Sequence, residues 1–180
     1  MTNIDITFGL PAEKERDLDK TMQLFKWLQS KHRPLEVTMV NGQSFRLCIS
    51  GLQLRDRKID MCTTVIKDKD NRVTLPVDYI ASVEQILGEE IDTSHEGKLT
   101  VRRGDLEDEG YKPSGRDFFR IIRQAYQDGK NIRVYLCDNR IVEGGSIGMD
   151  EQQVSVRLPE GKVIWIFYDW VDRILPIEKV

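Results

Sequence analysis

The sequence predicts a mainly β protein with some helix, folded as two tandem small β-barrels. Each barrel is expected to have an N-terminal helix and a bent, five-stranded antiparallel sheet. Two observations support this fold class. The alternating apolar pattern of residues 35–53 returns at 132–150, and that of 73–80 returns at 164–171. An apolar stripe at helical spacing precedes each copy, and two copies are too few for a solenoid, so the repeat indicates a duplicated compact domain.

The expected boundaries are a first domain at 1–86, with an N-terminal arm and a helix, an acidic linker at 87–113, and a second domain at 114–180. The chain has 180 residues and a net charge of −3. Acidic residues concentrate in the linker, which leaves the two domains near neutral. This acidity favours a loose spacer, although residues 98–101 could add a strand.

The first helix is predicted to begin near Pro11 and to end before Pro34. Proline suits the first turn of a helix, where its missing N–H is not needed. Apolar residues then recur four and three positions apart and form one stripe, at Leu18, Met22, Phe25 and Leu28. The cationic run at 31–33 favours the helix C-terminus. Residues 2–10 permit either a short strand or a loose arm.

The second helix is predicted from its cap and its terminator. Ser114 can cap the helix with Asp117 three residues later. Gly129 can end it, because glycine accepts the left-handed backbone that follows many helices. One face of this helix is apolar, with Phe118, Ile121, Ile122 and Ala125.

Each helix is followed by five predicted short strands. The first strands, at 35–39 and 132–136, end in the pairs Asn41-Gly42 and Asp138-Asn139, which tolerate positive φ and favour hairpins. The third, fourth and fifth strands are expected at 59–65, 73–77 and 81–86 in the first copy, and at 154–158, 163–168 and 172–177 in the second. Five short strands in so few residues are expected to close their core by bending into a barrel.

These patterns resemble the Hfq branch of the Sm-like family, bacterial RNA chaperones with an N-terminal helix and a bent five-stranded barrel. The resemblance covers residues 24–86 and 117–177. The stretch from Phe118 to Asn139 is similar to the entry of that domain, and the stretch from Gly144 to Asp150 is similar to its second strand. The resemblance implies a non-catalytic, cytoplasmic protein that binds single-stranded RNA, either a post-transcriptional regulator or an RNA chaperone.

The chain departs from that family where the Tyr-Lys-His run enters the last strand. Pro76-Val77-Asp78 and Phe167-Tyr168-Asp169 stand at these positions. Because acids replace the imidazole, a uridine site at the pore is not expected. The alternative function is a protein-interaction or assembly module that kept the fold and lost RNA binding.

The expected RNA-binding residues are a basic loop, one aromatic residue and a cationic rim. Arginines can neutralise phosphate and stack on bases, and a strand tyrosine can stack a base. A solvated loop with local Arg–Asp pairs is the other interpretation of the basic loop. The residues are Arg55, Arg57 and Lys58 in the loop, Tyr135 in the second copy, and Lys31, His32 and Arg33 in the rim.

The run 163–170 is apolar on both faces, which is typical of a strand that needs a partner. It predicts self-association through the fourth strand of the second domain. Pro76, in the matching strand of the first copy, lacks an N–H and blunts that edge. The expected assembly edge consists of Trp165, Phe167, Tyr168 and Trp170.

Neither an enzyme nor a cofactor or metal site is expected. The sequence has no glycine-rich phosphate loop and no nucleophile beside a histidine. Cys48, Cys62 and Cys137 are widely spaced and odd in number, which favours reduced, buried thiols in a cytoplasmic protein. No apolar run approaches the roughly 18 residues that span a bilayer, so no membrane partner is expected.

Overall fold

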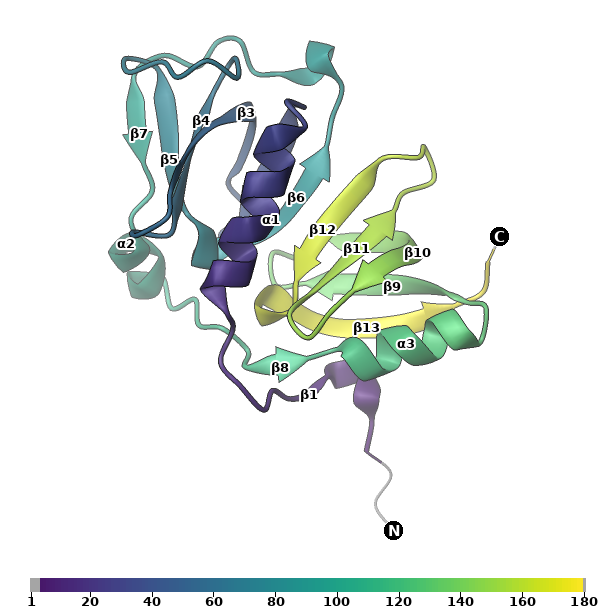
Figure 1. Cartoon of the computed structure of the whole chain (residues 1–180). Coiled ribbons are helices and arrows are strands. Elements are labelled where there is room, and N and C mark those ends of the chain that lie inside the picture. The colour runs from purple at the N-terminus through teal and green to yellow at the C-terminus, as the bar shows by residue number, and fades with distance from the viewer. Residues whose placement is uncertain (1–3, 180) are drawn as a thin grey trace. The chain divides into compact units, whose positions relative to one another are not determined.

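The computed structural model describes residues 4–179 and is dominated by β-strands (Figure 1). The chain forms two compact units. Asp17–Lys112 make one, which we call the N-unit. Met1–Arg16 and Pro113–Val180 together make the other, which we call the C-unit. The first three residues of the expected N-terminal arm lie outside the described residues.

The N-unit begins with helix α1, Leu18–Ser30. The Asp17 carboxylate caps it by accepting hydrogen bonds from the backbone N–H groups of Asp19 and Lys20, at 3.0 and 3.3 Å. The helix therefore starts later than expected, because this cap, rather than Pro11, defines its first turn. Met22, Phe25 and Leu28 are buried, and α1 packs on strand β3 (Figure 1). Each such side chain contributes about 1.5–3 kcal/mol when fully buried.

Six strands make up the sheet of the N-unit. They are β2 (Leu35–Met39), β3 (Ser44–Gln53), β4 (Lys58–Cys62), β5 (Arg72–Pro76), β6 (Ile80–Gln85) and β7 (Lys98–Thr100). Their spatial order is β6-β2-β3-β4-β5-β7. All neighbours are antiparallel except β5 and β7, which are parallel. A short 3-10 turn, η2 (Val77–Tyr79), joins β5 to β6.

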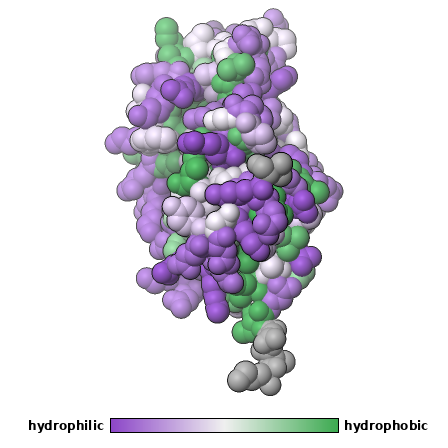
Figure 2. Space-filling view, turned by 90° about the vertical axis from the view of Figure 1, so that its right-hand side faces the viewer, coloured by the Kyte–Doolittle hydropathy of each residue, from purple (hydrophilic) through white to green (hydrophobic). Residues whose placement is uncertain are grey.

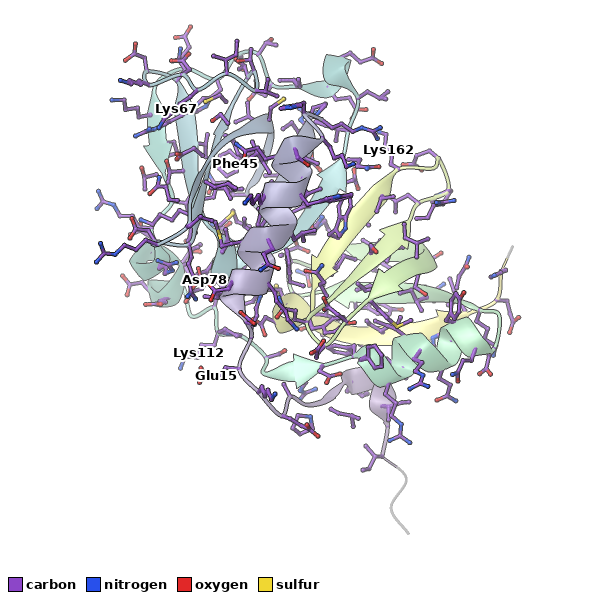
Figure 3. All side chains as sticks on the ribbon, viewed as in Figure 1. Glu15, Phe45, Lys67, Asp78, Lys112 and Lys162 are labelled. Atoms are coloured by element: carbon purple, nitrogen blue, oxygen red, sulfur yellow. The ribbon has the colours of Figure 1, made fainter. Side chains whose placement is uncertain are left out.

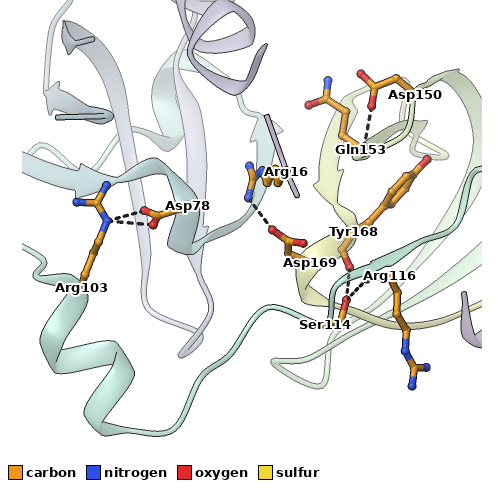
Figure 4. Close-up of polar contacts among 9 residues, drawn as sticks. All are labelled: Arg16, Asp78, Arg103, Ser114, Arg116, Asp150, Gln153, Tyr168 and Asp169. Atoms are coloured by element: carbon orange, nitrogen blue, oxygen red, sulfur yellow. Dashed lines mark hydrogen bonds and ion pairs between the residues drawn. The ribbon is translucent and has the colours of Figure 1, made fainter. Parts of the chain in front are cut away.

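The expected linker is folded onto the N-unit over much of its length. It contains the turn η3 (Gly88–Glu90), strand β7 and helix α2 (Arg103–Asp108), whose Leu106 is buried. Arg103 Nε donates to both carboxylate oxygens of Asp78, at 2.9 and 3.0 Å (Figure 4). The Tyr79 hydroxyl donates to Glu107 at 2.9 Å, and burial together with this carboxylate raises the pKa of Tyr79 to about 12. The acids of this segment thus take part in specific contacts, which composition alone does not reveal.

The C-unit combines the N-terminal segment with the C-terminal half of the chain. Leu10 and Pro11, strand β1, pair with Asp117 and Arg116 of strand β8. The other elements are η1 (Ile6–Phe8), α3 (Phe119–Gln127), β9 (Asn131–Leu136), β10 (Ile141–Met149), β11 (Gln153–Arg157), β12 (Val163–Phe167), η4 (Tyr168–Trp170) and β13 (Val171–Ile177). Its five long strands run in the order β13-β9-β10-β11-β12 and are antiparallel.

Helix α3 buries the face formed by Ile121, Ile122 and Ala125. Ser114 is not its cap, because its hydroxyl accepts the N–H of Arg116, which precedes the helix, and donates to the Tyr168 carbonyl, both at 3.3 Å (Figure 4). Asp117 instead accepts the backbone N–H of Phe119 at 2.9 Å. Gly129 follows the helix with φ of 68°, the left-handed conformation that the sequence predicted there.

The prediction of two tandem Sm-like β-barrels is wrong. The strands form open ladders, mixed in the N-unit and antiparallel in the C-unit. Within the described residues of each unit, the two strands at the ends of the order do not pair with each other. In the N-unit, β7 takes the edge of β5 that a closing strand would need. Alternating apolar residues fit an open, one-sided sheet as well as a barrel, so the pattern could not decide closure.

No helix in residues 4–179 is both long and apolar enough to span a membrane. The surface in Figure 2 is mainly hydrophilic, with apolar side chains in smaller areas.

Substituting Gly144 with alanine is expected to destabilise the protein by about 2 kcal/mol or more. An added Cβ would overlap the backbone carbonyl of Arg157 and lie 2.8 Å from a methyl group of Val156, and backbone on the neighbouring strand cannot move aside cheaply. Chemical denaturation of the full chain measures this difference. Gly104→Ala is the matched control, because nothing lies within 4 Å of its Cβ position in α2. Equal midpoints for the two variants would contradict the expected crowding.

Candidate functional site

A hollow of about 190 Å³ opens beside the C-terminal end of α1 in the N-unit. Two elements of the sheet form one side, because Leu35 at the start of β2 lies opposite Gln85 at the end of β6. The helix forms the other side. The hollow is lined by Trp27, Leu28, Lys31, Arg33, Leu35 and Gln85.

Helical geometry explains why an aromatic and a cationic group meet at this hollow. Trp27 and Lys31 are four residues apart and so lie on the same side of the helix. The Lys31 ammonium is 5.3 Å from the centroid of the indole, within cation–π range. Leu28 is buried, whereas Trp27 keeps 47% of its surface exposed. The hollow therefore has an apolar floor and an accessible aromatic wall.

The lining of the hollow carries two cations and no acid. Lys31 and Arg33 are both exposed. The nearest acid along the chain, Glu36, lies 3.9 Å from the guanidinium of Arg46. The hollow is consequently suited to an anion that also has a flat apolar part.

The basic loop lies elsewhere in the N-unit, in the turn between β3 and β4. Arg55 is exposed, and Arg57 has φ of 55° and places Nη2 3.1 Å from the Asp19 carboxylate. The Asp56 carbonyl accepts a hydrogen bond from Arg103 at 3.2 Å, which holds the turn. Lys58 is half-buried at the start of β4. The ion pair of Arg57 is thus made with Asp19 of the helix.

The basic β3–β4 turn and the cationic rim at 31–33 are at opposite ends of α1. Asp19, which binds Arg57, is in the first turn, and Lys31 follows the last. Twelve residues of helix separate them by about 18 Å along the axis. The loop and the 31–33 rim therefore do not share one pocket. His32, with φ of 52°, is exposed and does not line the hollow.

Tyr135 belongs to the C-unit. It is half-buried on β9, on the same side of the strand as Asn131 and Arg133. Arg133 pairs with Glu143 at 2.5 Å, and this carboxylate, followed by a hydrogen bond with Tyr135, raises the pKa of the arginine. The tyrosine hydroxyl is thus occupied, and the part of Tyr135 available for stacking is its ring.

The expected assembly edge is buried within the chain. Trp165, Phe167, Tyr168 and Trp170 expose 7%, 0%, 1% and 2% of their surface. The Arg16 guanidinium lies 3.5 Å from Asp169 (Figure 4) and 4.3 Å from the centroid of Phe167. Tyr168 packs edge-on against Phe118. These aromatic residues have a packing role inside the chain, and their role in assembly stays a prediction.

Sequence reasoning missed Trp27, Leu28, Leu35 and Gln85 as members of a site. One signal was present in the sequence. Trp27 falls outside the stripe of Leu18, Met22, Phe25 and Leu28, so the helical spacing places this large aromatic residue on the outward face. The pairing of Leu35 with Gln85 had no such signal, because it depends on the register between β2 and β6.

Residues 4–179 contain no group of three or more His, Cys, Asp or Glu side chains that could hold a metal ion. Cys48 and Cys62 are buried and lie opposite each other on β3 and β4. Burial, with a smaller contribution from Cys62, raises the pKa of Cys48. Burial and then the charge of Asp138 raise the pKa of Cys137 to about 11. These environments disfavour the reactive thiolate.

Comparison with known proteins defines the class to which this chain belongs. A family model described as "Repressor of phase-1 flagellin" matches residues 5–174, so the chain belongs to this family of repressors. The chain is 28% identical over 172 residues to the repressor of phase 1 flagellin gene of Salmonella abortus-equi, and 26% identical to that of Salmonella typhimurium. Each alignment covers 94% of this chain and 92% of the relative. No solved structure matches the chain.

This family corrects the expectation taken from the Hfq-like resemblance. The match spans nearly the whole chain, including the segment at 87–113 that the resemblance left out. The assignment to an Hfq-like or Sm-like RNA chaperone is therefore wrong, and so is the function drawn from it. The alternative, an assembly module with an Sm-like fold, loses its basis with the same finding. The residue patterns were real, but strand alternation and hairpin turns are shared by many unrelated β proteins.

The three cysteines are expected to react slowly with an aromatic disulfide reagent at pH 8. Cys48 and Cys62 are buried and Cys137 is half-buried, which limits access, and the raised pKa values of Cys48 and Cys137 keep those thiols protonated. The rate at Cys137 should rise about tenfold per pH unit below its pKa, since thiolate is the nucleophile. Absorbance of the released thiol measures this, with all three thiols titrating rapidly in denaturant as control. Rapid, stoichiometric labelling of the native chain would contradict it.

Proposed function

We propose that this protein represses expression of a flagellin gene. The observation that carries the proposal is the family match over residues 5–174 together with curated relatives that cover 94% of the chain and are named as repressors of the phase 1 flagellin gene. An alignment of this coverage leaves no large part of either protein unmatched. The repressing activity of those relatives is thus the function that the whole chain supports best.

We infer that repression proceeds in the cytoplasm, where the gene and its transcript are, and by binding rather than catalysis. The N-unit supports a binding role, because it presents a hollow with cationic and aromatic lining and a separate basic turn. Single-stranded RNA is the partner expected from the sequence and stays a proposal here. Self-association through β12 also stays a prediction, and the four aromatic side chains of β12 and η4 are buried, so a partner could reach them only after they become exposed.

Production of this protein in a bacterium that carries a phase 1 flagellin gene fused to a reporter should lower the reporter signal several-fold. The same reporter behind an unrelated promoter and leader is the control, and immunoblotting shows that the protein accumulates. Two fusions separate the levels of control: one carries the promoter alone, and the other carries the promoter with the untranslated leader. An unchanged signal from both fusions would end the proposal.

If the chain contacts single-stranded RNA through its basic turn, replacing Arg55 and Arg57 with alanine should weaken binding about tenfold at low salt and flatten the salt dependence. The Arg57–Asp19 pair lies near the surface and contributes no more than about 1 kcal/mol, so the double variant should remain folded. Fluorescence anisotropy with labelled leader RNA measures the affinity.

The matched control for this experiment removes two exposed arginines from α3, Arg120 and Arg123, and so changes the net charge equally. An equal loss of affinity in both double variants would show a general charge effect and reject the assignment to Arg55 and Arg57. Tyr135→Phe tests whether the hydroxyl is needed, and Tyr135→Leu removes the ring that would stack.

A further inference from the structure

We propose that the hollow at the end of α1 is a nucleotide-binding site, in which a base stacks on Trp27 and its phosphate is bound by Lys31 and Arg33. Neither the family nor the named relatives assign a ligand to these residues. The site is distinct from the basic turn at Arg55 and Arg57, which lies at the other end of the helix.

The aromatic wall of the hollow, Trp27, favours a ligand with a flat ring. Of the three tryptophans, Trp165 and Trp170 expose 7% and 2% of their surface and belong to the core, whereas Trp27 exposes 47%. The exposed part of the Trp27 indole is a flat apolar surface, and a planar ligand that covers it removes that area from water. Stacking of a base on such a ring contributes about 1–3 kcal/mol and needs only a flat π-face.

The charge of the hollow also favours a phosphate. Lys31 and Arg33 line the hollow, and no acid does. Their side chains are exposed, so an arriving phosphate would not have to displace a buried ion pair. A guanidinium binds phosphate with two parallel hydrogen bonds, and an ammonium binds it as a point charge. Both kinds of phosphate-binding cation are therefore next to the aromatic wall.

Size and polarity define the ligand further. The volume of about 190 Å³ lies below the roughly 300–1,000 Å³ of sites that enclose drug-sized molecules. One planar ring system can enter, but a helix or a duplex cannot. Leu28 and Leu35 form an apolar floor, and the Gln85 amide adds a polar group at the edge.

The shared chemistry of the ligand is that of a nucleotide, which has two possible sources. A nucleotide within a single strand would make the hollow part of the contact between the repressor and its target, and in that case the inference rests on the proposed function. A free nucleotide would make it an effector site. Comparison of mononucleotides with hexanucleotides distinguishes the two sources.

Tryptophan fluorescence of the full chain provides the test. Titration with AMP, UMP, hexa-adenylate or hexa-uridylate should give saturable quenching, because Trp27 is the accessible indole among the three. Inorganic phosphate and a hexaglutamate peptide at equal concentrations should not. Tighter binding of hexanucleotides than of mononucleotides supports a strand, and equal binding supports a free nucleotide.

Three variants assign the signal to the hollow. Trp27→Phe should remove the quenching while binding, measured by equilibrium dialysis, weakens only modestly. Lys31→Ala with Arg33→Ala should weaken nucleotide binding at least tenfold. Lys67→Ala with Lys69→Ala is the matched control, since it removes two exposed lysines from the loop before β5. Figure 3 labels Lys67 in this loop. Far-ultraviolet circular dichroism shows that each variant is folded.

The inference is overturned by any of three results. Nucleotides produce no saturable quenching, the two double variants bind equally, or hexaglutamate binds as tightly as the nucleotides and marks a surface for acidic peptides. None of these results depends on reporter repression, so failure of the site and failure of the proposed function can be told apart.

Discussion

Burial of one face of α1 against β3 is the constraint on which the N-unit and its hollow depend. Met22, Phe25 and Leu28 lie at the spacing of one helical face and are almost fully buried. With that face fixed inward, a helix of 3.6 residues per turn must direct Trp27 outward. The Asp17 cap fixes where the helix starts, and the Arg57–Asp19 pair connects that end to the β3–β4 turn. The position of the aromatic wall is thus set by core packing and not by the site itself.

The local elements were predictable where short-range chemistry decides them. The stripe from Leu18 to Leu28, the turn at Asn41-Gly42 and the terminator at Gly129 each depend on a few neighbouring residues, and each prediction agrees with the structure. The start of α1 and the cap of α3 were not, because Asp17 and Asp117 compete with Pro11 and Ser114 for these roles. Tertiary contacts hold the two residues that the sequence favoured: Pro11 pairs with Arg116, and the Ser114 hydroxyl donates to the Tyr168 carbonyl.

Sheet closure could not be predicted, for a different reason. Alternation of apolar residues reports that one face of a strand is buried, and it says nothing about whether the outermost strands meet. The strand β7 shows the limit clearly: its three residues are all exposed, yet they pair in parallel with β5. For the candidate site, Lys31 and Arg33 were selected for their charge alone. Helical spacing brings Lys31 to Trp27, but the proximity of both cations to Gln85 depends on the register between β2 and β6, which no local pattern reveals.

The pairing of β1 with β8 affects the order in which the protein can mature on the ribosome. Leu10 and Pro11 are synthesised early, but Asp117 and Arg116 follow only after the entire N-unit has been made. The β1 segment therefore stays unpaired while the N-unit, which follows it directly in the chain, completes its own core. Chains fold as units during synthesis, so the N-unit is able to finish first and the C-unit last, once β13 joins β9. A translation product that ended soon after Lys112 would contain a complete N-unit and an N-terminal segment without its partner strand.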